Sequence, residues 1–214
     1  MIKSYLIIGC GQFGAQAVAV LLLRDPSSRI TVVDKDERAI QEVSSYPVEA
    51  VVADGLCYLN QSLEQGQPVD YIIPAVPFHL AFETVLWQLR PFGAERGPVP
   101  VLAGLPNPIV GQTGDLYTSF AHFLCPKTCA GPAPCCTVTG ERREKPLYQV
   151  LGETYGSWAS YVIHSQQLGL GVGGFPPEAL VNLVQEIKAR QGKDRLILIS
   201  TACRCHGVTS ALSL

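Results

Sequence analysis

Three glycines near the start of the chain have the spacing of a phosphate-binding loop. Gly9, Gly11 and Gly14 lie between an apolar run, 5–8, typical of a buried strand, and an apolar segment, 15–23, typical of a helix. In such a loop the first glycine permits a tight turn, the second lets the backbone approach a pyrophosphate, and the third lets the helix pack on the strand. The free N–H groups of the helix N-terminus would then face the phosphates. The alternative is a strand-to-helix turn without a ligand.

An acidic residue lies where a dinucleotide site needs one. Asp34 ends a second apolar run, 30–33, and follows Gly14 by twenty residues. A carboxylate at this position suits the two ribose hydroxyls of NAD and repels the 2′-phosphate of NADP. The sequence therefore predicts NAD as the cofactor.

Soft metal ligands gather in a proline-rich part of the chain. Four cysteines lie within twelve residues: Cys125, Cys129, Cys135 and Cys136. Thiolates bind Zn²⁺ and iron–sulfur clusters, and such a centre would order a segment in which proline and glycine disfavour regular structure. The spacing matches neither the paired C-x-x-C of zinc ribbons nor the common ferredoxin runs. Adjacent cysteines rarely face one metal, so one of the last two could be spare. The alternative is a group of reduced structural thiols.

A third candidate group follows the last predicted strand, 195–200. Cys203, Arg204, Cys205 and His206 come directly after it. Catalytic groups collect where parallel strands end, and an arginine beside thiols can hold an anion or lower a thiol pKa. We therefore assign these four as candidate catalytic residues. Three of them, all but the arginine, are also candidates for a fourth metal ligand. The alternative is an irregular C-terminal turn.

Strands and helices alternate around these groups. Apolar runs predict strands at 5–8, 30–33, 48–52, 69–74, 99–102, 160–164 and 195–200, and helices at 15–23, 35–43, 78–90 and 176–190. Such alternation implies a parallel sheet with helices on both faces, and the loops after its strands gather at the carboxyl edge, where ligands bind. We predict an α/β fold: a Rossmann-like doubly wound parallel sheet of about seven strands with a Pro/Cys-rich irregular insertion.

Composition divides the chain into three parts. Nine of the sixteen prolines lie between residues 91 and 146. We expect an NAD-binding Rossmann core at 1–108, a Pro/Cys-rich insertion with a metal or cluster site at 109–155, and a strand–helix–strand unit at 156–214 that continues the same sheet. The last part contains a second glycine-rich loop, 169–174, which could bind an anion or simply form a turn.

The first hundred residues resemble a known family. The segments 9–14, 32–37 and 51–55 are similar to those of RCK or KTN (TrkA-N) type NAD-binding Rossmann domains, which regulate potassium channels and potassium uptake systems. The resemblance implies that the glycines hold phosphates, that Asp34 holds the ribose and that Asp54 lies near the adenine. The candidate cofactor-binding residues are Gly9, Gly11, Gln12, Phe13, Gly14, Asp34, Lys35, Asp54 and Gly55.

The charge and hydropathy of the sequence restrict the kinds of binding partner that we expect. Charged residues are 16% of the chain and the net charge is −2, which provides no electrostatic footprint for nucleic acid or for an anionic membrane. No apolar run reaches the roughly eighteen residues of a membrane helix, and no signal peptide precedes the first strand. We therefore expect a cytoplasmic protein without membrane insertion, with a homodimer as a possible assembly. In that compartment eight cysteines favour core, metal or redox roles over disulfides.

Two functions fit these features. The first is an NAD(H)-binding oxidoreductase that acts on a small molecule and carries a cysteine-ligated zinc ion or iron–sulfur cluster. The second is a non-catalytic NAD(H) or redox sensor that regulates a partner protein, with a possible link to ion transport. The chain has no H-E-x-x-H and no G-x-S-x-G motif, so hydrolytic chemistry is not indicated.

Overall fold

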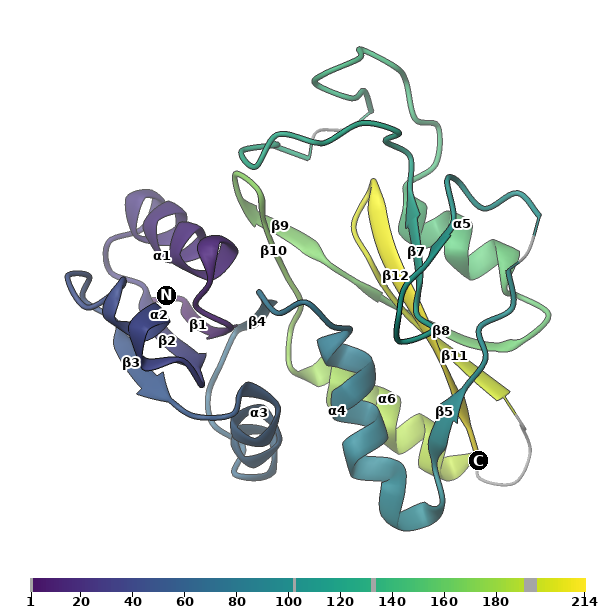
Figure 1. Ribbon diagram of the computed structural model, residues 1–214, viewed down its shortest axis with the longest axis horizontal. Coiled ribbons are helices and arrows are strands. Elements are labelled where there is room, and N and C mark those ends of the chain that lie inside the picture. Colours follow the sequence, from purple (N-terminus) through teal and green to yellow (C-terminus); the bar gives the residue numbers. More distant parts are fainter. Residues whose placement is uncertain (1, 102, 132–133, 191–195) are drawn as a thin grey trace.

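The computed structural model describes residues 2–101, 103–131, 134–190 and 196–214, which form two sheets with helices between and around them (Figure 1). The first sheet has four parallel strands in the order β3-β2-β1-β4: β1 (Ser4–Ile8), β2 (Arg29–Asp34), β3 (Glu49–Val52) and β4 (Tyr71–Pro74). Its helices are α1 (Gln12–Arg24), α2 (Glu37–Gln41) and α3 (Gly55–Glu64). This strand order and alternation are those of one half of a Rossmann fold, as the sequence predicts.

Alternate residues of β1 face opposite sides of the first sheet. Tyr5 and Ile7 pack in one buried cluster with α1 and α2, while Leu6 and Ile8 pack in another with α3. Both faces of the strand are therefore buried, which explains why it is a continuous apolar run in the sequence.

The second sheet is mixed and has the order β6-β7-β12-β11-β8, with β5 paired to β12. Its strands are β5 (Glu95–Gly97), β6 (Ile109–Val110), β7 (Leu116–Ser119), β8 (Ala159–His164), β11 (Leu196–Ala202) and β12 (His206–Ser213). Only β8 and β11 are parallel; the other pairs are antiparallel. A separate hairpin consists of β9 (Gln166–Gly169) and β10 (Val172–Gly174).

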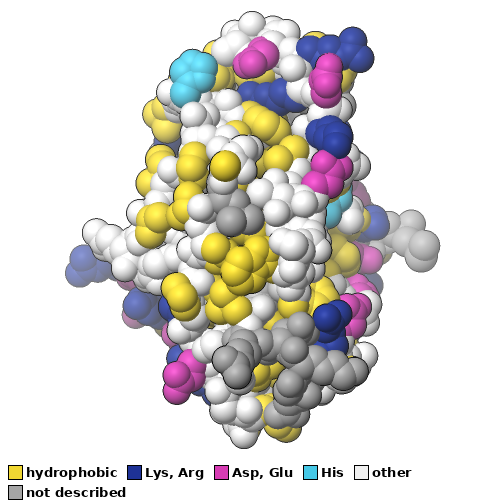
Figure 2. Space-filling model, turned by 90° about the vertical axis from the view of Figure 1, so that its right-hand side faces the viewer, with side chains coloured by type: hydrophobic (Ala, Val, Ile, Leu, Met, Phe, Trp, Pro, Cys, Tyr) yellow, Lys and Arg dark blue, Asp and Glu magenta, His cyan; other side chains and the backbone are white. Residues whose placement is uncertain are grey.

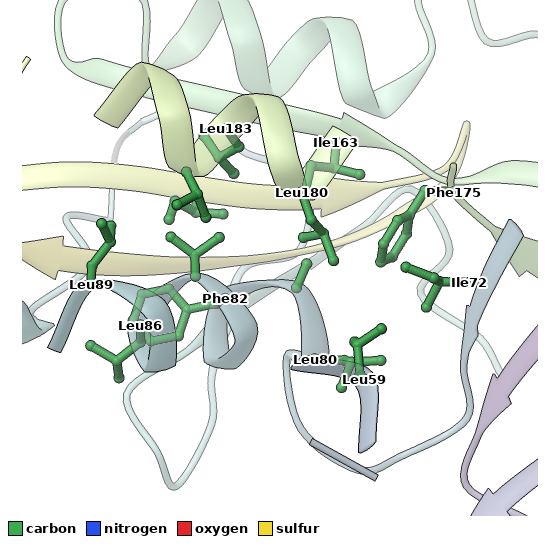
Figure 3. Close-up of a cluster of buried hydrophobic side chains, with 14 of the residues drawn as sticks. Leu59, Ile72, Leu80, Phe82, Leu86, Leu89, Ile163, Phe175, Leu180 and Leu183 are labelled. Atoms are coloured by element: carbon green, nitrogen blue, oxygen red, sulfur yellow. The ribbon is translucent and has the colours of Figure 1, made fainter. Parts of the chain in front are cut away.

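Two helices join the sheets into one core. They are α4 (Leu80–Leu89), followed by the short helix η1 (Arg90–Phe92), and α6 (Glu178–Ala189). Their side chains pack with Leu6 and Ile72 of the first sheet and with Ile163 and Ile199 of the second (Figure 3). The far face of the second sheet is covered by α5 (Leu147–Thr154). Because one cluster contains residues of both sheets, the two halves of the chain share a hydrophobic core.

The structure does not contain the predicted single sheet of about seven strands. The chain leaves the first sheet after β4, and β11 turns back into the antiparallel β12, so the later strands build a sheet of their own. The predicted strand at 99–102 is also displaced: the structure has β5 at Glu95–Gly97 instead, and residue 102 lies outside the described residues. The C-terminal strands therefore do not extend the Rossmann sheet.

Part of the predicted insertion is regular. The strands β6 and β7 and the helix α5 fall within 109–155 and belong to the second sheet or its cover. Between β7 and α5, the described residues of 120–146 contain no helix or named strand. The domain boundaries themselves stay predictions. On the side of the molecule that lies at the right in Figure 1, acidic and basic side chains lie beside one another near apolar ones (Figure 2).

Candidate functional site

The glycine loop lies between β1 and α1, and its three glycines have different surroundings. Gly9 has a φ of +101°, and a Cβ there would lie 2.4 Å from the carbonyl oxygen of Ala75. A Cβ at Gly14 would lie 2.0 Å from the carbonyl oxygen of Gly9. At Gly11 a Cβ would meet nothing within 4 Å. The chain itself thus requires the first and third glycines, while the second borders open space at the N-terminus of α1.

The N-terminus of α1 is free to meet an anion. Gly11 is its N-cap and provides no side-chain hydrogen bond, and the first turn, all of which is described, has no acidic residue. The backbone N–H groups of that turn therefore lack a side-chain acceptor, and the helix dipole favours negative charge there.

Asp34 is fixed beside this loop. Its Oδ2 accepts a hydrogen bond from the Cys10 amide at 2.6 Å, and its Oδ1 accepts one from the Asp36 amide at 2.9 Å. The buried Cys10 thiol donates to the carbonyl of Ala39, and burial, followed by the charges of Asp34 and Glu42, raises its pKa to about 11. Cys10 is therefore a protonated packing residue, and the carboxylate of Asp34 is held at the end of β2.

The other predicted cofactor residues follow the strands of the first sheet. Gln12 and Phe13 are exposed in the first turn of α1, and Lys35 is exposed directly after β2. Asp54 accepts a hydrogen bond from the Cys57 amide at 2.9 Å and caps α3. A Cβ at Gly55 would lie 2.5 Å from a methyl group of Ile8, so this glycine serves packing. All nine residues thus lie at one edge of the sheet.

A cavity of about 1100 Å³ extends from the glycine loop to the cysteine-rich loops. Phe13 forms part of its wall, and the loop after β7 provides Cys125 and Cys129. The four residues predicted as catalytic line it as well: Cys203, Arg204, Cys205 and His206. The first turn of α1 and the C-terminal turn, which are far apart in the sequence, therefore share one cavity, while Gly9, Gly11, Gly14 and Asp34 are not among the described residues that line it.

Strand pairing explains how the two cysteine groups meet. In the register of β7 and β12, Ser119 pairs with His206, and the next amide, of Phe120, donates to the carbonyl of Cys205 at 2.9 Å. The cysteine-rich loop thus begins beside the turn between β11 and β12. Cys125 Sγ lies 3.4 Å from His206 Nε2, and Cys203 Sγ lies 3.9 Å from His206 Nδ1.

Thiol acidity differs within this group. Burial raises the pKa of Cys125, and the charges of Cys129 and Cys136 raise it further. Burial also raises the pKa of Cys205, against the effect of Arg143, which donates a hydrogen bond to its sulfur. In contrast, hydrogen bonds from Thr139 and from the Val138 amide lower the pKa of Cys136. Partial removal from water lowers the pKa of His206.

The predicted metal set is only partly brought together. Cys125 and Cys129 line the cavity, whereas Cys135 and Cys136 are not among the described residues that do. Cys135 forms a backbone bridge with Arg142. Within the described part of the chain, no three histidine, cysteine or acidic side chains are already placed to hold a metal ion.

Two side-chain pairings, one on the cavity wall and one next to it, could not be recognised in the sequence. The ring centroids of Tyr148 and His164 lie 4.0 Å apart on the cavity wall, and burial lowers the pKa of His164. Arg143 lies in a run of charged residues, 141–145, and its guanidinium is 5.3 Å from the centre of the Phe120 ring. Neither pairing has a local sequence signal, because the partners come from separate elements.

Comparisons with known proteins agree with the two-part structure. A family model described as "Uncharacterized protein, C-terminal domain" matches residues 81–214, more than half of the chain. The chain belongs to this family. A TrkA-N domain model matches residues 5–57, which confirms the resemblance of the N-terminal region and supports dinucleotide binding there. The family match begins in α4 and includes the whole second sheet.

A relative has the same extent. An uncharacterized protein of Archaeoglobus fulgidus is 27% identical over 222 aligned residues, covering 97% of this chain and 98% of its own. The combination of both parts is therefore not limited to this chain. Among the described residues, no helix is long and apolar enough to cross a membrane.

Proposed function

We propose that the protein is an NAD(H)-binding oxidoreductase whose small-molecule substrate occupies the cavity between the glycine loop and the cysteine-rich loops. One observation carries the proposal: the wall of a single cavity includes Phe13 of the glycine loop and the group from Cys203 to His206. A dinucleotide that lies along the carboxyl edge of the first sheet would have its reactive end near that wall.

The residues present suit the cofactor. Open space at Gly11 and the uncapped N-terminus of α1 fit a pyrophosphate, and the fixed carboxylate of Asp34 fits a ribose with two free hydroxyls. When bound, NAD(H) supplies a ring that accepts or donates a hydride. The cavity is slightly larger than the usual range of about 300–1,000 Å³ for small-molecule sites, which leaves room for a substrate beside that ring.

The C-terminal turn supplies groups for proton transfer. The lowered pKa of His206 favours a neutral ring that can accept a proton. Arg204 provides a positive charge on the same wall for an anionic substrate. Cys203 and Cys205 flank this arginine in the chain and line the same cavity.

A second candidate is a non-catalytic NAD(H) or redox sensor. The TrkA-N match at residues 5–57 favours it, because the resemblance at these residues is to regulatory domains. Hydride transfer to a panel of aldehydes, ketones and thiol-reactive substrates distinguishes the two. Turnover supports the oxidoreductase, whereas NADH binding that changes only assembly or partner affinity supports the sensor.

Gly11→Ala tests the shared premise of dinucleotide binding. Gly11 has a φ of −67° and a Cβ there meets nothing in the chain, so alanine should leave the melting temperature unchanged. Its methyl group would occupy the space of the pyrophosphate, and calorimetry should show NADH affinity reduced about tenfold or more. The control is Gly152→Ala on α5, where a Cβ is also accommodated; its NADH affinity should equal that of the parent protein.

Asp34→Asn tests the choice of cofactor. The amide keeps an acceptor but loses the charge, so NADH should bind roughly tenfold more weakly while NADPH binding changes little. Negligible binding of both nucleotides by the parent protein would refute the proposal.

A further inference from the structure

We propose that Cys125, Cys129, Cys136 and Cys203 form a four-thiolate site for one soft metal centre. The fourth ligand comes from the turn between β11 and β12, about seventy residues beyond the other three, and Cys135 is not a ligand. The proposal goes beyond dinucleotide binding and does not depend on it, since these residues belong to the family domain of residues 81–214.

Backbone amides point at three of these sulfurs. Cys203 Sγ accepts hydrogen bonds from the amides two and three residues later, those of Cys205 at 3.4 Å and His206 at 3.3 Å. Cys136 has the same pattern, with donors two and three residues later at Val138 and Thr139. A neutral thiol is a weak acceptor, whereas a thiolate is a strong one, and donors aimed at sulfur stabilise thiolates that bind metals. Two turns of unrelated sequence thus share a geometry suited to thiolate ligands.

The third sulfur has a related contact. Cys129 Sγ accepts a hydrogen bond from the Gly131 amide at 3.4 Å and lies 3.9 Å from the hydroxyl of Thr137, the neighbour of Cys136. This contact brings the two ends of the loop, Cys129 and Cys136, together.

Cys125 connects the loop to the turn. Its sulfur contacts one nitrogen of the His206 ring while Cys203 contacts the other, and Cys125, Cys129 and Cys203 line the same cavity. In this arrangement the His206 ring lies between two of the proposed ligands. Binding of a metal would require this exposed ring to swing aside and the sulfurs to close around the ion.

Cys135 is excluded by its backbone. It forms an antiparallel bridge with Arg142, and successive side chains in such an extended segment point to opposite sides. If Cys136 faces the other thiols, Cys135 faces away. We therefore assign Cys135 as the spare one of the two adjacent cysteines.

Within its described residues the loop also lacks regular secondary structure. The described residues of 120–146 form no helix or named strand, and Leu124 is 97% exposed. A centre bound by both the loop and the turn would cross-link this segment to the second sheet. Four sulfur donors select zinc-type ions or an iron–sulfur cluster over magnesium or calcium.

Metal content distinguishes the two kinds of centre. Full-length protein purified without oxygen should contain either one zinc ion per chain and no colour, or iron and sulfide with visible absorption. After metal removal under reducing conditions, it should bind one Co²⁺ with a thiolate charge-transfer band, which Zn²⁺ abolishes. Absence of metal after purification, together with absence of this band, would overturn the proposal.

Serine substitutions identify the ligands. Replacement of any one of Cys125, Cys129, Cys136 or Cys203 should weaken Co²⁺ binding at least tenfold. Cys135→Ser is the matched control within the loop and Cys57→Ser the control outside it, and both should bind as the parent does. Equal losses for Cys135→Ser and Cys203→Ser would contradict the assignment. NADH binding by each variant, measured in parallel, keeps this result separate from the dinucleotide site.

A measurement on the unmodified chain tests the same set of ligands and does not depend on whether the variants fold. Zn²⁺ should protect Cys125, Cys129, Cys136 and Cys203 from iodoacetamide, as mapped by mass spectrometry, and leave Cys135 as reactive as in metal-free protein. Protection of Cys135 in place of Cys203 would refute the proposed set.

Discussion

A buried histidine shows how single residues couple this fold to pH. His79 is 4% exposed; its Nδ1 lies 2.8 Å from the Ser210 hydroxyl and its Nε2 lies 2.8 Å from the Thr201 hydroxyl. Behind them, Ser210 donates to Asp115, which pairs with Arg96. Burial is the largest effect on the ring and lowers the pKa of His79 to about 3, so the ring is neutral in the folded protein at neutral pH.

We expect His79 to make stability fall as the medium becomes acidic. Between the ordinary histidine pKa near 6.5 and about 3, the unfolded chain binds a proton that the folded chain does not. The free energy of unfolding should therefore decrease by up to about 1.4 kcal/mol per pH unit in this window. The folded pKa of Asp115 is lowered, so its contribution is lost only below an ordinary aspartate pKa of about 4.

Urea unfolding of His79→Gln between pH 6.5 and 5 isolates this effect. The variant should be less stable at pH 7, because the hydroxyl groups of Ser210 and Thr201 lose their contacts with the ring. The slope of its free energy of unfolding against pH should be smaller than that of the parent by an amount that corresponds to about one proton. His164 and His206, whose pKa values are also lowered, account for the remaining slope. Parallel pH profiles for variant and parent would exclude this role of His79.

Among the elements, the β9–β10 hairpin supports the cysteine-rich loop. Its turn residue Gly171 has a φ of +69° and donates its amide to the carbonyl of Cys129 at 2.9 Å. Gln16 of α1 donates to the carbonyl of Lys127 at 2.8 Å. The second glycine-rich segment, 169–174, thus forms a hairpin whose glycines allow close contact with α1 and the loop.

We predict that Gly171→Ala is markedly more destabilising than an ordinary substitution at positive φ. A Cβ at Gly171 would lie 1.7 Å from the Lys127 carbonyl oxygen, so the loop must move. Gly114→Ala is the matched control, because Gly114 has a φ of +82° but a Cβ there meets nothing within 4 Å. The control should lose about 1–2 kcal/mol from backbone strain alone, and Gly171→Ala distinctly more, in urea unfolding. Faster proteolysis within 120–146 should accompany only the second variant; similar losses for both would contradict the close approach.

Elements differ in how far the sequence specifies them. The strands β1, β2 and β4 were predictable because buried parallel strands are continuous apolar runs, and α6 because Leu180, Leu183, Val184 and Ile187 recur at helical spacing. In the second sheet, β8 and β11 match predicted strands, whereas β5, β6 and β12 were not predictable, since β5 and β6 are very short and β12 contains glycine, serine and threonine. The cysteine-rich loop and the turn that contains Cys203 lie together because β7 pairs with β12, and no local sequence pattern indicates this pairing.

At the scale of the whole molecule, backbone hydrogen bonds join the first sheet to the segment between the β9–β10 hairpin and α6, and the side chains of the shared core join it to the second sheet. Ile72 of β4 and Phe175, directly after β10, exchange two hydrogen bonds of 2.8 and 3.0 Å. Phe175 is fully buried in the cluster that also contains α4 and α6 (Figure 3). A ligand between the glycine loop and the second sheet would therefore contact two parts that are already fixed to each other.

Because the two sheets share one hydrophobic core, we predict that they unfold together. Phe175→Ala should reduce the free energy of unfolding by about 3–5 kcal/mol, because it leaves a cavity in the shared core. Hydrogen exchange should then accelerate by the same factor in β1 and in β11, and far-UV circular dichroism and Trp fluorescence should report one transition. Phe92→Ala is the control, since its side chain is 47% exposed and its loss should cost far less. Faster exchange confined to β11 and its neighbours would mean that the Rossmann sheet folds by itself, and that the cavity lies between two independent units.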